Sequence, residues 1–230
     1  MCTHADKLDE HISTLMHERN IAGLSLAIIQ GDKIVKEGAY GFADKSNKSP
    51  ATSATLFQAG SVSKCVAALG ALHLVEEGYL SLDAAINTPL HTWKLVENEF
   101  TKDNNVTLRH ILAHCAGVNV HGFPGYAVDA PCPTLLEVLD GTKPANTPAI
   151  RVDAVPGSKP RYSGGGYTVM QQMMIDVTGK SFPEYMAEAV LKPLGMLSST
   201  YEQPLPREMM SSAATGYAIG GEAIAVRWHV

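Results

Sequence analysis

A serine and a lysine stand three residues apart in the segment "GSVSKC", residues 60–65. Residues at this spacing share one face of a helix, so the Ser61 hydroxyl and the Lys64 amine converge if a helix begins at Ser61. A serine hydroxyl becomes a good nucleophile when a neighbouring base, such as a lysine or a tyrosine activated by one, takes its proton. The N-terminus of a helix also favours an oxyanion. Serine is equally a preferred helix N-cap, and the tetrapeptide alone favours that capping interpretation.

The bulk composition is that of a globular protein with a hydrophobic core. The chain has 230 residues, of which 45% are hydrophobic and 18% charged. Its net charge of −5 and the lack of any Lys/Arg run argue against nucleic acid or an anionic membrane as a partner. No stretch approaches the roughly 18 apolar residues of a membrane span. We therefore expect a soluble protein that acts on small molecules.

The four cysteines indicate neither a zinc site nor a disulfide framework. Cys2, Cys65, Cys115 and Cys132 form no C-x-x-C pair. The N-terminal "MCTHADKLDEH" is too charged for the apolar segment of a signal peptide. A cytoplasmic location is the default expectation, and a periplasmic or secreted one stays open if an export signal has been removed.

The elements that must position Ser61 are predicted from periodicity. Residues 6–19 show the spacing of an amphipathic helix. Residues 23–43 alternate in hydrophobicity on either side of "GD" and predict a β-hairpin. Apolar residues at helical spacing over 61–77, followed by Gly78, predict a buried helix.

The remainder of the chain changes character near residue 200. From residue 79 to about 200 the pattern predicts helical pieces separated by Pro- and Gly-containing loops. Small and β-branched residues around "GG" in residues 201–230 favour a return to extended structure. We find no internal repeat and no low-complexity segment.

Four segments, in order, resemble motifs of one known family. These are "FQAGSVSKCVAALGALHLVEEGYLSLD", "VTLRHILAHCAGV", "PGSKPRYSGGGYTVMQQMMIDVTGKSFPEYM" and "LKPLGMLSST". They resemble the serine β-lactamase and penicillin-recognising family over essentially residues 5 to 220. Within that family the strongest resemblance is to class C β-lactamases and β-lactamase-like carboxylesterases.

The resemblance implies an α/β (α+β) fold of the β-lactamase/transpeptidase type. It has an antiparallel sheet flanked by helices and an inserted all-helical region, with Ser61 in the cleft between them. We expect residues 1–60 to form the N-terminal part of the α/β region and residues 61–200 the mainly helical region. Residues 201–230 would begin the return to the α/β region.

The resemblance also implies site residues and a reaction. Ser61 would be the acylated nucleophile, Lys64 its proton-shuttling partner and Tyr162 the phenolic base or acid, with no metal or organic cofactor. Gly164 would lie at a substrate-binding position where many relatives have an asparagine. That difference favours a carboxylesterase acting on small-acyl esters. A β-lactamase or D-Ala-peptidase is the alternative, and a catalytically silent binding or assembly protein is the other.

A third family motif, K-T-G, H-x-G or W-x-G on a strand, is not found after Tyr162. The nearest match, "VTGK" at residues 177–180, follows helical spacing and has Gly179 at a helix-stop position. By resemblance that strand supplies the second oxyanion-hole donor, whose loss typically costs about 10²- to 10³-fold in rate. We therefore expect a chain truncated at its C-terminus and impaired as an enzyme. The missing segment is a candidate partner as a separate chain.

Other residue groups have the types or the spacing of a functional site. His110 and His114 have the spacing of an H-E-x-x-H zinc site without its glutamate, and His121 follows, but the resemblance assigns His114 to a packing position. Three aromatic residues are candidates for an acyl pocket, although core or rim positions are more common for such residues: Trp93, Phe123 and Tyr126. A further set is expected on the core face of a helix: Met170, Met173, Met174 and Asp176.

Overall fold

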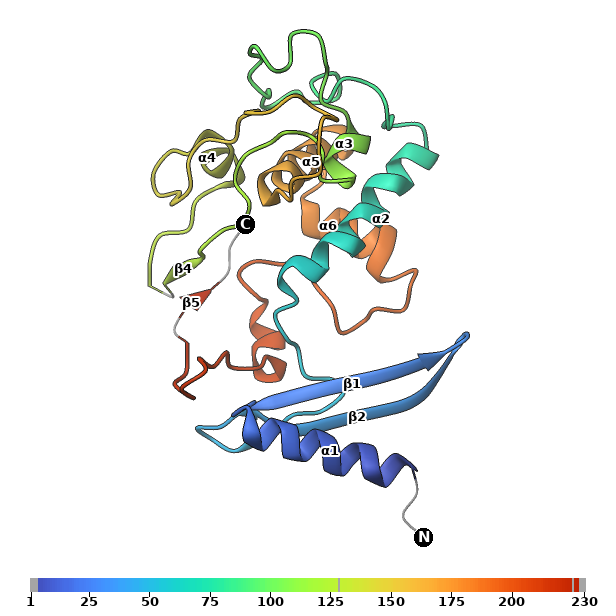
Figure 1. Ribbon diagram of the computed structural model, residues 1–230, viewed down its shortest axis with the longest axis vertical. Coiled ribbons are helices and arrows are strands. Elements are labelled where there is room, and N and C mark those ends of the chain that lie inside the picture. Colours follow the sequence, from blue (N-terminus) through green and yellow to red (C-terminus); the bar gives the residue numbers. More distant parts are fainter. Residues whose placement is uncertain (1–3, 128, 225, 228–230) are drawn as a thin grey trace. The chain divides into compact units, whose positions relative to one another are not determined.

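The computed structural model describes residues 4–127, 129–224 and 226–227. The chain divides into two compact units. Figure 1 shows the chain coloured from its N-terminus to its C-terminus. Unit 1 comprises Met1–Gln58 and Leu205–Ala225, and unit 2 comprises Ala59–Pro204 and Val226–Val230. No helix within the described ranges is long and apolar enough to cross a membrane.

Unit 1 is built on the predicted helix and hairpin, and both predictions are confirmed. Helix α1 (His4–Glu18) precedes β1 (Gly23–Gln30) and β2 (Lys33–Asp44), which pair antiparallel, and the short β3 (Ser49–Pro50) pairs with β2. The turn is the expected "GD", with Gly31 at φ +64°. Helix α1 lies along the hairpin (Figure 1).

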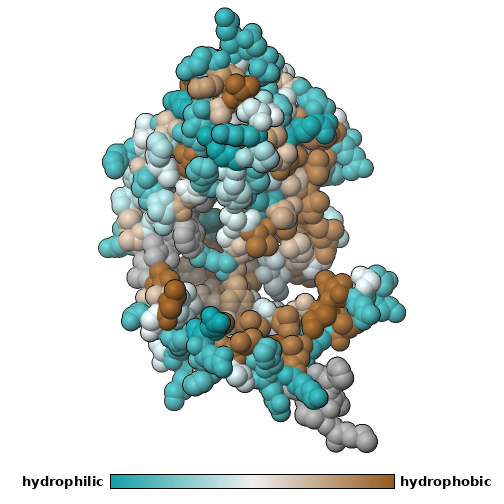
Figure 2. Space-filling view, viewed as in Figure 1, coloured by the Kyte–Doolittle hydropathy of each residue, from teal (hydrophilic) through white to brown (hydrophobic). Residues whose placement is uncertain are grey.

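Contacts between α1 and β2 fix the helix on the sheet. Asp9 forms an ion pair with Lys36 at 2.7 Å and accepts a hydrogen bond from the Tyr40 hydroxyl. Gly41 permits a close approach, because a Cβ there would lie 2.9 Å from the Met16 methyl carbon and 2.3 Å from the Ala22 carbonyl oxygen. Apolar side chains near the hairpin turn stay exposed (Figure 2): Ile29, Ile34 and Val35.

The extended structure predicted for residues 201–230 is largely absent from the described part of that segment. Residues Arg207–Ser212 form a 3-10 helix, η3, because Pro206 has φ −54° and its carbonyl accepts the Met209 N–H. Extended pairing is limited to the isolated bridges Leu56–Ala213 and Tyr217–Ala223 and to the two-residue β5. The prediction for residues 225 and 228–230 lies outside the described residues.

Unit 2 is mainly helical around one hydrophobic core. Its short strands β4 (Tyr126–Ala127) and β5 (Val226–Arg227) pair antiparallel. The core includes the most buried side chains of α5, and the predicted inward position of its methionines is confirmed: Met170, Met173 and Met174. The helical elements of unit 2 are η1 (Gly60–Val62), α2 (Ser63–Glu76), α3 (Leu108–Leu112), α4 (Leu135–Asp140), α5 (Gly164–Thr178), α6 (Phe182–Met186) and the π-helical turn η2 (Ala187–Leu191).

The helix predicted over residues 61–77 is present, but α2 buries only one of its faces. The buried face carries small residues and one leucine: Ala67, Gly70, Ala71 and Leu74. A Cβ at Gly70 would lie 2.5 Å from the Met186 sulfur, so the small residues let α6 approach closely. Leu69 and Leu72 lie outside this buried face and are 47% and 41% exposed.

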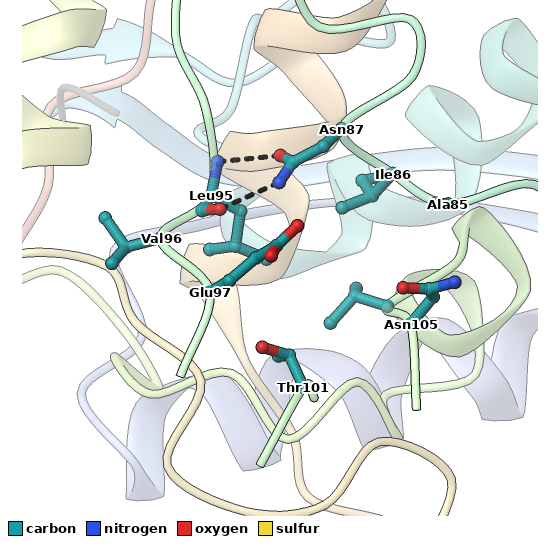
Figure 3. A pocket seen from close by; sticks show the side chains of 9 residues that line it. Ala85, Ile86, Asn87, Leu95, Val96, Glu97, Thr101 and Asn105 are labelled. Carbon is teal, nitrogen blue, oxygen red and sulfur yellow. Dashed lines mark hydrogen bonds between the residues drawn. The ribbon is translucent and has the colours of Figure 1, made fainter. Parts of the chain in front are cut away.

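Polar side chains hold the loops of unit 2. The Asn87 side chain makes two hydrogen bonds to the backbone of Leu95. Its Nδ2 donates to the Leu95 carbonyl oxygen at 2.8 Å, and its Oδ1 accepts from the Leu95 N–H at 2.9 Å. Figure 3 shows this pair beside a cavity of about 30 Å³, which is large enough only for water. Helix α5 ends at Thr178 with Gly179 at φ +66°, which confirms that "VTGK" is a helix end.

Candidate active site

Ser61 lies in the single 3-10 turn that leads into α2. Gly60 has φ +51°, a conformation that glycine adopts without strain, and it directs the chain from the preceding loop into the helix. The Ser61 side chain is exposed. Within the described residues its backbone N–H donates to no protein acceptor, as expected for the first turn of a helix. A carbonyl oxygen brought to Ser61 would find this donor free.

Lys64 is on the same face as Ser61, one turn further along. Its Nζ donates to the Ser61 Oγ at 3.2 Å. The ammonium also lies over two aromatic rings, 5.3 Å from the centroid of Tyr162 and 5.7 Å from that of Tyr167. A cation within about 6 Å of a ring face is attracted by the ring quadrupole. These contacts hold the half-buried lysine beside the serine.

Tyr162 comes from a loop 101 residues later, immediately before α5. Its hydroxyl donates to the Ser61 Oγ at 2.7 Å. Burial raises the pKa of the Tyr162 phenol, but its interactions with Ser61 and with the positive charge of Lys64 outweigh burial, so the pKa lies below its ordinary value. The structure therefore brings together the three residues that the sequence nominates, Ser61, Lys64 and Tyr162.

A partly buried tyrosine holds the start of α2 in place. The Tyr201 hydroxyl donates to the Ser63 carbonyl oxygen at 2.6 Å, and its ring packs edge-on against Phe182 with centroids 5.1 Å apart. Burial raises the pKa of Tyr201 to about 12. A neutral phenol fixed in this way holds the helix turn between Ser61 and Lys64 in place.

Two further aromatic residues next to Tyr162 were not identified as site residues from the sequence. The His114 ring lies 4.4 Å from the Tyr162 ring and 5.1 Å from the Tyr167 ring, measured between centroids. Burial lowers the pKa of His114, and the charge of Lys64 lowers it further. The sequence offered one signal, since "HCAG" lies in a segment that resembles a family motif.

Gly164 begins α5, and its polar groups are already paired. Its N–H donates to the His121 carbonyl oxygen at 3.0 Å, and its carbonyl oxygen accepts from Thr168 Oγ1 at 3.2 Å. The residue is buried, and a Cβ added to it would lie 3.0 Å from the Phe123 ring. Its assignment to substrate binding stays a prediction. Phe123 fills the space into which a side chain at position 164 would project.

The other sequence candidates lie in structural positions. Trp93 Nε1 donates to Asp140 at 2.8 Å, and the Tyr126 hydroxyl accepts from the Asn146 N–H at 3.3 Å, so both buried aromatics have partners of their own. His121 Nδ1 is 2.6 Å from the Tyr162 carbonyl oxygen.

Asp176 does not face the core, contrary to the expectation from its neighbouring methionines. Its half-buried carboxylate accepts from the backbone N–H groups of His91 and Thr92 and from the Thr92 hydroxyl, at 2.6–3.0 Å. Burial raises the pKa of Asp176, but these hydrogen bonds and one from Gln172 outweigh burial and lower the pKa. Asp176 thus fixes a loop of unit 2.

A larger cavity of unit 2 lies far from the serine. It measures about 350 Å³ and is lined by residues that follow the C-terminus of α2, among them Gly78, Tyr79 and Leu80. Ser61 precedes the N-terminus of the same helix, whose 14 residues span about 20 Å. This cavity therefore plays no part in chemistry at Ser61.

A serine hydroxyl held between an amine and a phenol, beside a free backbone N–H, has the composition of a serine nucleophile site. Comparison with known proteins gives the family. The model of the Beta-lactamase family matches residues 8–224, so the chain belongs to the Beta-lactamase family, a family of serine hydrolases with the β-lactamase/transpeptidase-like fold.

Three relatives show the range of this similarity. A Beta-lactamase from Pseudomonas fluorescens is 29% identical over 219 residues, which are 95% of this chain and 56% of that protein. The octameric penicillin-binding protein homologue from Pyrococcus abyssi has a TM-score of 0.76 at 27% identity, covering 97% of this chain and 50% of that one. The Beta-Lactamase/D-Alanine Carboxypeptidase from Pseudomonas syringae has a TM-score of 0.72 at 27% identity, covering 96% and 57%. The chain thus spans about half the length of these relatives.

Proposed function

We propose that the protein is a serine hydrolase that works through an acyl-enzyme at Ser61, with carboxylic esters of small acyl groups as substrates. The observation that carries the proposal is the position of the Ser61 Oγ, 3.2 Å from Lys64 Nζ and 2.7 Å from the Tyr162 hydroxyl. Both distances lie within or close to hydrogen-bonding range, which a nucleophile and its base must reach.

The proposed reaction begins with transfer of the Ser61 proton to the Tyr162 phenolate. The positive charge of Lys64 favours that phenolate, which is why the pKa of Tyr162 is lowered. The Ser61 Oγ then bonds to the ester carbonyl carbon, and the resulting oxyanion accepts a hydrogen bond from the Ser61 N–H.

Collapse of the tetrahedral intermediate breaks the ester C–O bond. The Tyr162 hydroxyl donates its proton to the departing alkoxide, so an alcohol leaves and Ser61 stays acylated. Water next gives a proton to Tyr162 and adds to the acyl carbon. The second collapse releases the carboxylic acid, and Ser61 regains its proton from Tyr162.

The surroundings of Gly164 support the preference for esters. An amide side chain at this position could bind a substrate carbonyl, but the chain has no side chain here and the space is taken by Phe123. The Gly164 N–H is donated to His121 and is not available to a substrate amide. An ester needs fewer polar partners than a peptide or a β-lactam with its amide substituent.

A second candidate is β-lactam hydrolysis or D-Ala-peptide cleavage. The similarity to the Beta-Lactamase/D-Alanine Carboxypeptidase from Pseudomonas syringae, which has the same fold, supports it. Acylation of Ser61 would be the same in either case, and only the acyl donor would differ.

Mass spectrometry of the intact protein tests the proposal. The protein is incubated with a fluorophosphonate, with benzylpenicillin and with a series of p-nitrophenyl esters, and the modified peptide is sequenced. We expect the fluorophosphonate adduct on Ser61, its loss in Ser61→Ala and its retention in Ser63→Ala. Turnover of short-chain esters in preference to penicillin supports the esterase. A stable penicilloyl adduct or faster penicillin hydrolysis supports the second candidate, and the absence of any Ser61 adduct contradicts both.

A further inference from the structure

His114 contacts the backbone on both sides of Tyr162. Its carbonyl oxygen accepts the Arg161 N–H at 2.6 Å, and its imidazole Nδ1 accepts the Ser163 N–H at 3.2 Å. Between these two hydrogen bonds its ring packs on the Tyr162 ring, with 4.4 Å between centroids. One residue therefore contacts three consecutive residues of the loop that carries the phenol.

The hydrogen bond from Ser163 defines the state of the imidazole. A backbone N–H can only donate, so Nδ1 carries no proton and a neutral ring has its proton on Nε2. The titratable groups that face the ring are Lys64 from α2, Tyr167 from α5 and Tyr162 itself. The lowered pKa of His114 is consistent with a neutral ring, which leaves Lys64 as the cation that acts on the phenol.

The backbone of His114 is held in a conformation that most residues avoid. Its φ of +52° lies in the left-handed region, which costs a non-glycine residue roughly 1–2 kcal/mol. Such a conformation persists only where the surroundings hold it, and it is concentrated at functional sites. Here it lets the carbonyl oxygen and the ring of one residue face the same segment, residues 161–163.

We infer that His114 is a positioning residue for Tyr162, which it keeps within hydrogen-bonding distance of Ser61 by fixing the Tyr162 backbone and ring. The inference rests on the proposed function, since Tyr162 matters as the base that accepts the Ser61 proton. Without His114 Nδ1, the Ser163 N–H loses its acceptor and the loop that carries Tyr162 is less restrained. A displacement of about 1 Å in a catalytic group can cost on the order of 100-fold in rate.

Two substitutions separate the contributions of the hydrogen bond and the ring. His114→Gly removes both, and glycine adopts the positive φ without the steric cost that a side chain has there. His114→Asn tolerates the left-handed conformation and places a carbonyl oxygen near the position of Nδ1. His110→Asn is the matched control, because His110 lies four residues earlier and its Nδ1 has no hydrogen-bond partner among the described residues.

The first measurement needs no substrate. The phenol of Tyr162 is titrated by ultraviolet difference spectroscopy in the intact protein, with Tyr162→Phe as the reference. We expect His114→Gly to raise the pKa of Tyr162 towards the ordinary value of about 10, while His114→Asn and His110→Asn leave it low. An unchanged pKa in His114→Gly overturns the inference, even if Ser61 reacts with every probe.

The second measurement is the labelling of Ser61 by the fluorophosphonate at increasing concentration. We expect His114→Gly to lower the maximal labelling rate about 10- to 100-fold without changing the half-saturating concentration, and His114→Asn to restore most of it. In a Tyr162→Phe background the effect of His114→Gly should vanish. An equal loss in both backgrounds shows a merely structural role and contradicts the inference. If the titration behaves as expected while Ser61 never reacts, the proposed function fails and the positioning role stands.

Discussion

Two helix N-termini meet near the candidate site, and they use their backbone donors differently. At the start of α5 the N–H groups of Gly164, Gly165 and Gly166 donate to the His121 carbonyl, the Val120 carbonyl and the Ser163 hydroxyl. At the turn before α2 the Ser61 N–H has no protein acceptor within the described residues. Both ends have the polarity to stabilise an anion.

The difference shows which of the two helix ends has a backbone donor available to a substrate. The start of α5 is satisfied by its own loop and serves to fix Tyr162, which directly precedes its N-cap Ser163. The turn before α2 keeps a donor free beside an exposed hydroxyl. The backbone donors of the glycine run "SGGG" are therefore used within the fold, and the turn with a single glycine is the one whose donor is available to a substrate.

Removal of the positive charge beside Ser61 should have the largest effect, and that effect is on the rate of Ser61 labelling. Lys64→Met takes away the cation that favours the phenolate, so the pKa of Tyr162 should rise. We expect Ser61 labelling to fall about 10²- to 10⁴-fold, the range of general acid–base catalysis, and its rise with pH to move to higher pH. Lys64→Arg keeps the charge and should keep the pH profile closer to that of the wild type. Identical pH profiles for the two variants would count against the role of the charge.

Crowding the start of α5 should destabilise the protein, because that end is packed. A Cβ at Gly165 would lie 2.9 Å from the Asn119 carbonyl oxygen, which belongs to the rigid backbone, so Gly165→Ala should cost about 1–3 kcal/mol in the free energy of unfolding. Urea denaturation measures this cost. At Gly166 a Cβ would meet nothing closer than 3.8 Å, so Gly166→Ala should be neutral or stabilise by up to about 1 kcal/mol. Equal costs for the two variants would show that the packing is not as described.

Loss of the anchor at α2 should have the smallest effect at neutral pH. Tyr201→Phe removes the hydrogen bond to the Ser63 carbonyl, and we expect a loss of about 1 kcal/mol in the free energy of unfolding. Because the pKa of Tyr201 is about 12 in the folded protein and about 10 in the unfolded chain, its contribution is present below pH 10 and is lost as the pH rises towards 12. Urea denaturation of wild type and Tyr201→Phe should therefore give values that converge above pH 10. A constant difference between pH 8 and pH 12 would contradict the assignment.

Local patterns predicted the elements that short-range forces determine. The hairpin follows from alternation around "GD", the convergence of Ser61 and Lys64 from their spacing, and the end of α5 from Gly179. The composition around "GG" predicted extended structure within residues 201–230, but Pro206 starts a 3-10 turn over Arg207–Ser212. Small and β-branched residues favour strands only weakly, and local turn chemistry prevailed.

Contacts between distant segments could not be derived from spacing. Tyr162 was predicted as a site residue only from the family resemblance, because nothing in "YSGGGY" shows that its hydroxyl contacts Ser61. The spacing of His114 fits a metal ligand and the resemblance gives it a packing position, because its contacts are with a loop that follows 47 residues later in the chain. The half-buried state of α2 was also missed, because Leu69 and Leu72 fit the same helical pattern as the residues that pack inwards.

The most direct test of the account compares covalent labelling of Ser61 in the wild type and in Tyr162→Phe. The substitution removes one hydroxyl, which lies 2.7 Å from the Ser61 Oγ, and keeps the ring that packs on His114. The account predicts that the second-order labelling rate at neutral pH falls about 10²- to 10⁴-fold while the melting temperature stays close to that of the wild type. Equal labelling rates in the two proteins would contradict the claim that Tyr162 takes the Ser61 proton.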